Sequence, residues 1–275
     1  MVQGHVQKIL NNINTRVAIR NIFDKKFNNP YNKPRLEQSN LGLLFNESKL
    51  LLSDNLDLIL ECEKIKDLLF YSIDPLNLLH INKKIQSANN INVEQLSLKD
   101  LDEDEIRLLQ KYDLIVSFLS LHYSNDVIGS LIQYKNFLNH EGSFLAILFG
   151  GETLIELKSC FIEADENLYG KIYPRIIPMI QPKIVPSLLQ RAKYNNPIIT
   201  IEKVKIYYDN LKSMLGDLKN LGQRNFLKDK GKQFDCKNYF KQVEDLYFKK
   251  YSEKDKIFAS FEFIIIFSSR NQNIK

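Results

Sequence analysis

Residues 113–126, which read DLIVSFLSLHYSND, indicate how this chain of 275 residues folds. The apolar run Tyr112–Leu119 is of the kind that forms a strand buried on both faces of a sheet. The closing Ser-Asn-Asp can cap a helix, which the periodic apolar residues of Val127–Leu138 predict. A second apolar run, Ser143–Phe149, follows. Strand, helix and strand in this order are typical of a parallel sheet covered by helices.

The same alternation extends in both directions along the chain. The other predicted strands are Leu56–Leu60, Leu68–Ile73, Ile91–Leu96 and Ile198–Tyr208, and the other predicted helices lie around Leu41–Leu52, Thr153–Glu166, Leu188–Ala192, Leu211–Leu221 and Tyr239–Tyr251. The final element, Ile257–Phe267, places its apolar residues on one face, which suits an antiparallel strand added late. We therefore expect an α/β, Rossmann-like fold with a mostly parallel sheet.

One large domain is expected. Residues 1–50 should form an N-terminal arm and helix, and residues 51–275 the domain itself. Four prolines at intervals of four, Pro174 to Pro186, exclude a continuous helix and predict an extended, lid-like excursion at about 166–197. The tyrosines near it either line a groove for a partner protein or pack the lid against the sheet; they are Tyr169, Tyr173, Tyr194, Tyr207 and Tyr208.

Composition excludes several classes of protein. With 44% hydrophobic and 26% charged residues the chain can build a core, and its apolar runs are too short to cross a membrane. The three cysteines lie far apart and the histidines lack ligand spacing, so no metal site is expected. The net charge of +5 is spread out, which argues against nucleic acid. Residues 1–23 contain three basic residues and no acid, which indicates a basic amphipathic helix or a mitochondrial presequence.

Several motifs resemble one branch of the class I S-adenosylmethionine (SAM)-dependent methyltransferases. They are SLHYSND at 120–126 and FGGETLIEL at 149–157, supported by IFDKK at 22–26, SLLQRA at 187–192 and LKNLGQRN at 218–225. This branch contains the complex I assembly factor of mitochondria and alpha-proteobacteria and lies close to the biotin-pathway methyltransferase BioC. The resemblance implies a seven-stranded sheet whose last strand is antiparallel, with SAM as the cofactor.

The chain departs from this family where the cofactor loop belongs. The resemblance implies a D/E-x-G-x-G-x-G loop after the first strand, because the backbone must approach the cofactor closely. After the predicted strand Leu56–Leu60 the chain instead reads ECEKIK at 61–66, without a glycine. Asp74, which would bind the ribose or simply form a turn with Pro75, follows Glu61 by only thirteen positions. A parallel crossover needs a dozen or more residues, so we expect the first crossover helix to be shortened or missing.

Candidate site residues follow from these strand ends. Glu61, Asp74, Phe118 and Leu119 are the cofactor-binding candidates, although SAM binding is doubtful without the glycines. His122 follows the strand Tyr112–Leu119 and is either a general base or a packed core residue. Glu152 and Glu156, four apart, form either a catalytic carboxylate pair or a solvated helix face. Gly150 and Gly151 leave backbone amides for an anion, or form a tight turn.

The sequence supports three functions. The first is a methyltransferase-like protein with a degenerate cofactor loop that acts through a protein partner, as in respiratory-complex assembly. The second is an active enzyme that methylates a carboxyl group or a protein side chain, with His122 as the base. The third, implied only by the resemblance, is modification of an arginine held by Glu152 or Glu156. The expected location is the cytoplasm of a bacterium or the mitochondrial matrix of a eukaryote.

Overall fold

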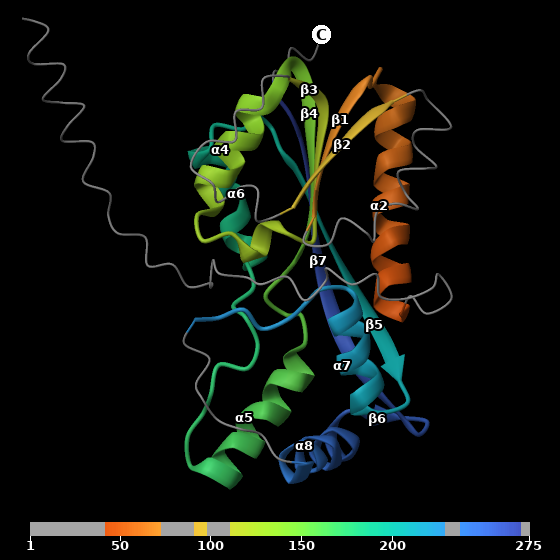
Figure 1. The fold of residues 1–275 in the computed structure, drawn as a ribbon, viewed down its shortest axis with the longest axis vertical. Helices are drawn as coiled ribbons and strands as arrows, with labels where there is room; N and C mark the ends of the chain where they lie inside the picture. Colours follow the sequence, from red (N-terminus) through yellow and green to blue (C-terminus); the bar gives the residue numbers. More distant parts are fainter. Residues whose placement is uncertain (1–41, 73–90, 98–110, 229–236, 271–275) are drawn as a thin grey trace, which may run out of the picture.

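The computed structural model describes residues 42–72, 91–97, 111–228 and 237–270, and Figure 1 shows how their helices and strands are arranged. One sheet organises the molecule. Its strands lie in the order β2 (Asn92–Ser97), β1 (Asp67–Ser72), β3 (Tyr112–Phe118), β4 (Leu138–Phe149), β7 (Lys256–Ser269) and β5 (Ile198–Tyr208), and the short β6 (Ser252–Glu253) pairs with β7. The pairs β1–β2, β1–β3 and β3–β4 are parallel, and β7 is antiparallel to both β4 and β5. The expected class and the antiparallel last strand are confirmed.

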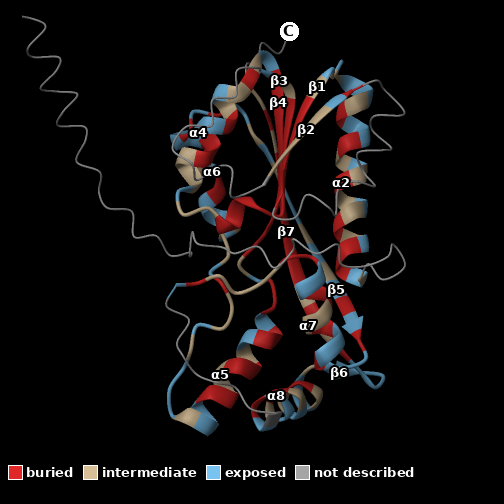
Figure 2. Ribbon diagram, in the orientation of Figure 1, coloured by how far each residue is buried: buried red, intermediate tan, exposed pale blue. Residues whose placement is uncertain are grey.

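Helices cover both faces of the sheet. They are α2 (Leu43–Cys62), α4 (Val127–Phe137), α5 (Ile155–Tyr169), α6 (Val185–Arg191), α7 (Leu211–Asn220) and α8 (Lys237–Lys250), with single 3-10 turns at Leu121–Tyr123 and Pro182–Ile184. Alternate strand residues point to opposite faces. Leu69 and Ile115 pack with residues of α4 and α6, whereas Leu68 and Val116 pack with residues of α2, α5, α7 and α8. Figure 2 shows the buried strands between these two helical layers.

Apart from α2, the described helices form where the sequence predicts them, with ends within a few residues. The carboxylate of Asp126 accepts a hydrogen bond from the Gly129 amide at 2.8 Å and so caps α4. Residues 170–181 contain no helix, as the prolines require, and Pro186 lies in the first turn of α6, where a proline costs no hydrogen bond. The excursion expected at 166–197 is therefore bounded by α5 and contains α6.

The strand predicted at Leu56–Leu60 is wrong. These residues belong to α2, which also crosses the expected boundary at residue 50 and continues to Cys62. Its buried side chains, Leu44, Phe45, Ser48, Leu52, Leu56 and Ile59, recur every three or four residues. A window of five residues shows too little of this period to distinguish a buried helix from a buried strand.

This correction changes the connection before the sheet. The link at 63–66 joins a helix to β1, which was expected to be the second strand and is instead the first strand in the described residues. In the described part of the chain no strand precedes β1. The expected shortening of the first crossover depended on that wrong strand. β1 pairs directly with β3, and its own connection to β2 runs through residues 73–90, which lie outside the described residues, so the prediction of a shortened or missing crossover helix is not tested.

Candidate functional site

The candidate cofactor crevice lies where the direction of the sheet reverses. From β1 the chain proceeds outward to β2, and from β3 it proceeds the other way to β4. In open α/β sheets, ligands bind outside the carboxyl ends of the strands at such a switch point. Phe118 ends β3, and Leu119 follows with φ of 46° while its amide donates to the Ile147 carbonyl at 2.7 Å. A left-handed leucine is unusual and marks a turn that its surroundings hold in place.

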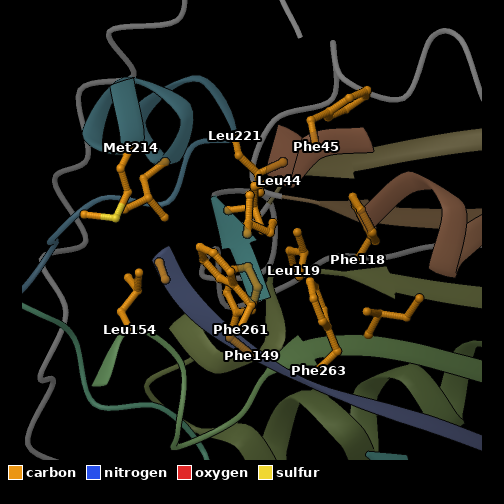
Figure 3. Packing of buried hydrophobic residues seen from close by; sticks show 14 of the residues in the cluster. Leu44, Phe45, Phe118, Leu119, Phe149, Leu154, Met214, Leu221, Phe261 and Phe263 are labelled. Carbon is orange, nitrogen blue, oxygen red and sulfur yellow. The ribbon is translucent and has the colours of Figure 1, made fainter. Parts of the chain in front are cut away.

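Apolar side chains from α2 fill the space beside this turn. Leu44 and Phe45 belong to the same buried cluster as Phe118, Leu119 and Phe149, and each of the five is at most 3% exposed. Figure 3 shows these side chains converging from α2, β3 and β4. The start of a helix thus lies where the resemblance implies a cofactor.

Asp217 on α7 holds the start of α2 in this position. Its Oδ2 accepts hydrogen bonds from the Leu44 amide at 2.9 Å and from the Tyr208 hydroxyl at 3.0 Å. Burial raises the pKa of Asp217 above its ordinary value, and the hydrogen bonds from α2 and Tyr208 limit the rise. A side chain at Gly42 would collide with this carboxylate, because a Cβ there would lie 1.7 Å from Oδ1. Glycine at this position is therefore needed for the contact between α2 and α7.

The structure does not bring the three described cofactor candidates together. Phe118 and Leu119 lie at the carboxyl end of β3, whereas Glu61 is exposed at the other end of α2, about 24 Å along the helix from Phe45. This end lies near the amino ends of the strands, because four residues later the chain enters β1. Asp74 lies outside the described residues.

His122 is buried in the 3-10 turn after β3. Its Nε2 lies 3.1 Å from Oε1 of Gln223, and its ring contacts those of Tyr123 and Phe149 at centroid distances of 4.6 and 5.5 Å. Nδ1 is buried without a hydrogen-bond partner. Burial lowers the pKa of His122 to about 4, which the bond to Gln223 only partly opposes. The ring is therefore neutral at pH 7, and a base of this pKa is weak at that pH.

Glu152 and Glu156 point to different partners. Glu152 precedes α5, and its exposed carboxylate bonds Lys203 at 2.5 Å. Glu156 is buried in α5 and accepts hydrogen bonds from the amide and hydroxyl of Ser260 on β7. The structure therefore gives each carboxylate a role in joining the start of α5 to neighbouring strands.

The Gly150-Gly151 segment forms a tight turn. The Gly150 amide donates to the carbonyl of Glu262, and the Glu152 amide donates to the carboxylate of the same residue at 3.1 Å. The amides of Thr153 and Leu154 also bond carbonyls, those of Gly150 and Ser260. The amides of Gly150, Glu152, Thr153 and Leu154 are thus used within the fold, which favours the tight turn.

A cavity of about 530 Å³ lies beyond the carboxyl end of β4, among α5, α7, α8 and the proline-rich segment. Its lining is mostly apolar, with Phe149, Leu157 and Met179 among the contributors. Three cationic residues also line it, Arg175, Lys219 and Arg224, and none of its lining residues in the described ranges is acidic. Sequence analysis missed this cavity, since its walls come from elements far apart in the chain.

Arg175 is fixed at the cavity wall by Asp165, which is fully buried in α5. The guanidinium donates to both carboxylate oxygens at 2.6 to 2.9 Å. It also stacks on the Tyr239 ring, with its central carbon 4.1 Å from the ring centroid. The two charged groups are ten residues apart on either side of a loop, a spacing that carries no signal in the sequence.

The tyrosines near the proline-rich segment fall into two groups. Tyr194 and Tyr208 are 5% and 4% exposed, so they belong to the core and cannot line a surface groove. Tyr207 is 38% exposed on β5, and Tyr173 packs edge-on against Tyr169 at a centroid distance of 5.9 Å. Packing of the lid against the sheet therefore accounts for the first pair.

Comparisons with known proteins place the chain in a family, although no family model matches it. It is 33% identical over 168 residues to the Dictyostelium discoideum protein named arginine-hydroxylase NDUFAF5, mitochondrial; the match covers 60% of this chain and 38% of that protein. It is 30% identical over 156 residues to a Rickettsia prowazekii protein named as a methyltransferase, RP459. That match covers 54% of this chain and 69% of the Rickettsia protein. The chain belongs to this methyltransferase family. A malonyl-acyl carrier protein O-methyltransferase of Nitrosospira multiformis is 26% identical to this chain over 133 residues. That match covers 48% of this chain and 38% of the Nitrosospira protein.

The chain lacks the glycine loop that the resemblance implies for its cofactor. It spans less than half the length of the Dictyostelium and Nitrosospira relatives. Between Gly42 and Gly129 the sequence contains no glycine, so neither the end of β1 nor the end of β2 is followed by a glycine loop.

None of the helices in the described ranges combines the length and hydropathy that a bilayer crossing requires. The described residues also contain no cluster of three His, Cys, Asp or Glu side chains suited to a metal.

Proposed function

We propose that this methyltransferase-family chain does not use SAM and acts by binding a protein partner in respiratory-complex assembly, the role that the resemblance implies. One observation carries the proposal: the space outside the carboxyl end of β3 is filled by Leu44 and Phe45 of α2. A sulfonium nucleoside would need that space and would need backbone amides that a glycine loop supplies.

The surroundings of the three candidate catalytic side chains support the same proposal. His122 is held neutral with a pKa of about 4, and Glu152 and Glu156 bond Lys203 and Ser260. These three groups, which would serve as base and substrate clamp, are thus enclosed or engaged within the fold. The Dictyostelium relative is named as mitochondrial, which supports a mitochondrial location if the source of this chain is a eukaryote. The resemblance to the complex I assembly factors supports a respiratory complex as the place of the partner.

Calorimetry and thermal unfolding with SAM test the proposal. A ligand at a hundredfold over its dissociation constant adds about 2.7 kcal/mol to the free energy of unfolding. For a protein of this size that raises Tm by roughly 5 to 10 °C. We expect no shift and no heat with 1 mM SAM or S-adenosylhomocysteine, while the Nitrosospira relative, treated identically, responds. A shift of 5 °C or more in this chain would overturn the proposal.

A second candidate function is methyl transfer to an anionic acceptor such as a carboxyl group. The cavity beyond β4 favours it, because Lys219 and Arg224 line it in addition to Arg175, whose charge is paired with Asp165, and no described lining residue is acidic. The same charge disfavours an arginine side chain as substrate. Incubation with methyl-labelled SAM and a cell extract distinguishes this candidate, since label on protein or small carboxylates requires an active enzyme.

A further inference from the structure

The cavity beyond β4 has the size and the apolar walls of a small-molecule site. Its walls include Leu157 of α5 and Leu218 of α7, which are 1% and 6% exposed. Figure 1 shows α5, α7 and α8 at the end of the molecule opposite α4 and α6. The volume of about 530 Å³ lies within the range of about 300 to 1,000 Å³ that is typical of ligand pockets. The cavity can therefore enclose most of a small organic molecule.

Two anchors hold the proline-rich segment in place as one wall of the cavity. On one side, both carboxylate oxygens of Asp165 accept hydrogen bonds from the guanidinium of Arg175. On the other side, the Asn225 side chain donates to the Pro174 carbonyl at 2.7 Å. Because Asn225 follows Arg224 and Pro174 precedes Arg175, the same bond brings the two arginines to one part of the wall. A wall already in place costs a ligand little ordering of the segment.

The charge of the lining is positive. Lys219 lies in the last turn of α7, and Arg224 follows in the segment after this helix. Arg175 is the third cation of the lining, but Asp165 balances its charge. No lining residue in the described ranges is acidic, so Lys219 and Arg224 favour a ligand with an anionic group.

A ligand complementary to this cavity has an apolar body and one anionic end. We propose that the cavity binds a medium-chain fatty carboxylate, with its hydrocarbon chain between α5 and α7 and its carboxylate beside Lys219 and Arg224. A nucleotide or another polyanion fits less well, because most of the lining offers it no hydrogen bonds. The proposal goes beyond the proposed function. The carboxylate binds in the absence of SAM, so this test and the SAM test can fail separately.

Methionine-methyl NMR of the full chain locates the ligand, because the chain contains only three methionines. Met179 lines the cavity, whereas Met214 is fully buried in α7 and does not line it. In protein labelled with carbon-13 at the methionine methyl groups, decanoate should shift the Met179 signal and leave the Met214 signal in place. Decanoate should bind roughly fifteenfold more tightly than octanoate, since each of its two additional buried methylenes contributes about fourfold.

Decanol and a charge variant test the role of the cations. Decanol lacks the carboxylate and should bind roughly tenfold more weakly than decanoate, or more weakly still. The double variant Lys219→Gln/Arg224→Gln should weaken decanoate binding to the level of decanol and leave decanol binding unchanged. The matched control is Lys212→Gln, because Lys212 is exposed on the same helix and does not line the cavity. This control should bind decanoate as the wild type does.

A variant that fills the cavity tests the place of the hydrocarbon chain. Leu215 of α7 lines the cavity and is partly exposed, so Leu215→Trp should remove the binding of both decanoate and decanol. Thermal unfolding of each variant is measured alongside, and the charge variant decides the outcome if Leu215→Trp does not fold.

Several results would overturn the proposal. They are a Met179 signal that does not respond to decanoate, decanol that binds as tightly as decanoate, and a folded Leu215→Trp variant that still binds. Sedimentation of the chain with phosphatidylglycerol vesicles, abolished in Lys219→Gln/Arg224→Gln, would assign these cations to a membrane surface instead.

Discussion

Removing the carboxylate of Asp217 should loosen α2 and destabilise the protein. In Asp217→Ala the Leu44 amide and the Tyr208 hydroxyl lose their acceptor, and both lie in the buried contact between α2 and α7. Leaving a buried donor unsatisfied costs about 1 to 3 kcal/mol, so the two together should lower the free energy of unfolding by about 2 to 6 kcal/mol. Tm should then fall by roughly 4 to 24 °C.

The asparagine variant is the matched control. Both hydrogen bonds end on one oxygen, Oδ2, so the amide oxygen of Asp217→Asn can accept both. We expect Asp217→Asn to unfold within about 1 kcal/mol of the wild type at neutral pH. Differential scanning calorimetry of the three proteins measures the difference, and guanidinium unfolding checks it. Equal losses in the two variants, or an alanine variant as stable as the wild type, would refute this account of the α2 contact.

The same residue gives a pH dependence of known sign. Burial raises the folded-state pKa of Asp217 above its ordinary value of 3.8. The stability that comes from this proton uptake is fully present below 3.8 and is lost as the pH rises through the raised pKa. Relative to Asp217→Asn, the wild type should therefore become less stable as the pH increases from 3 toward neutrality. A difference between the two proteins that does not change with pH would contradict the buried position of the carboxylate.

Three further changes probe other parts of the fold. Arg175→Ala leaves the fully buried Asp165 without its charge partner and should lower the free energy of unfolding, measured by calorimetry, by about 3 to 5 kcal/mol. Arg175→Lys should recover only part of this loss, because a lysine cannot donate to both carboxylate oxygens in one plane. Gly216→Ala in α7, where a Cβ meets nothing within 4 Å, should raise stability by about 0.5 to 1 kcal/mol in guanidinium unfolding. Burial raises the pKa of Cys160 to about 12, so iodoacetamide at pH 8 should modify the exposed Cys62 and leave Cys160 unmodified in the folded protein, as peptide mass spectrometry would reveal.

Local patterns sufficed to predict the fold from residue 112 onward. Tyr112–Leu119 and Ser143–Phe149 are long apolar runs with a capped helix between them, and β3, α4 and β4 form there. The final strand was recognisable because its alternation spans eleven residues. At Leu56–Leu60 five consecutive residues could not show whether the period was two or 3.6, and the rest of the helical face lay at Leu44 to Leu52.

The candidate site was harder to predict because it depends on contacts between distant elements. Once Leu56–Leu60 was taken as a strand, Glu61 was expected at its carboxyl end, whereas the helix carries it to the opposite end of the sheet. The Asp217 contact with α2 joins residues 173 positions apart. Neither the acid nor its helix has a sequence signature for this pairing, so only the three-dimensional arrangement reveals that Asp217 holds the start of α2.

If SAM needs the space that Leu44 and Phe45 fill, as we propose, its binding must displace these two side chains. Burying a leucine or phenylalanine side chain contributes about 1.5 to 3 kcal/mol, so displacing Leu44 and Phe45 would cost roughly 3 to 6 kcal/mol. At 1.4 kcal/mol per tenfold change, this weakens any residual affinity by about two to four orders of magnitude. A site that would otherwise bind at micromolar concentration would then need about 0.1 to 10 mM SAM. Because α2 is part of the same chain, this competition does not fade with dilution, and a partner protein that leaves α2 in place meets no such cost.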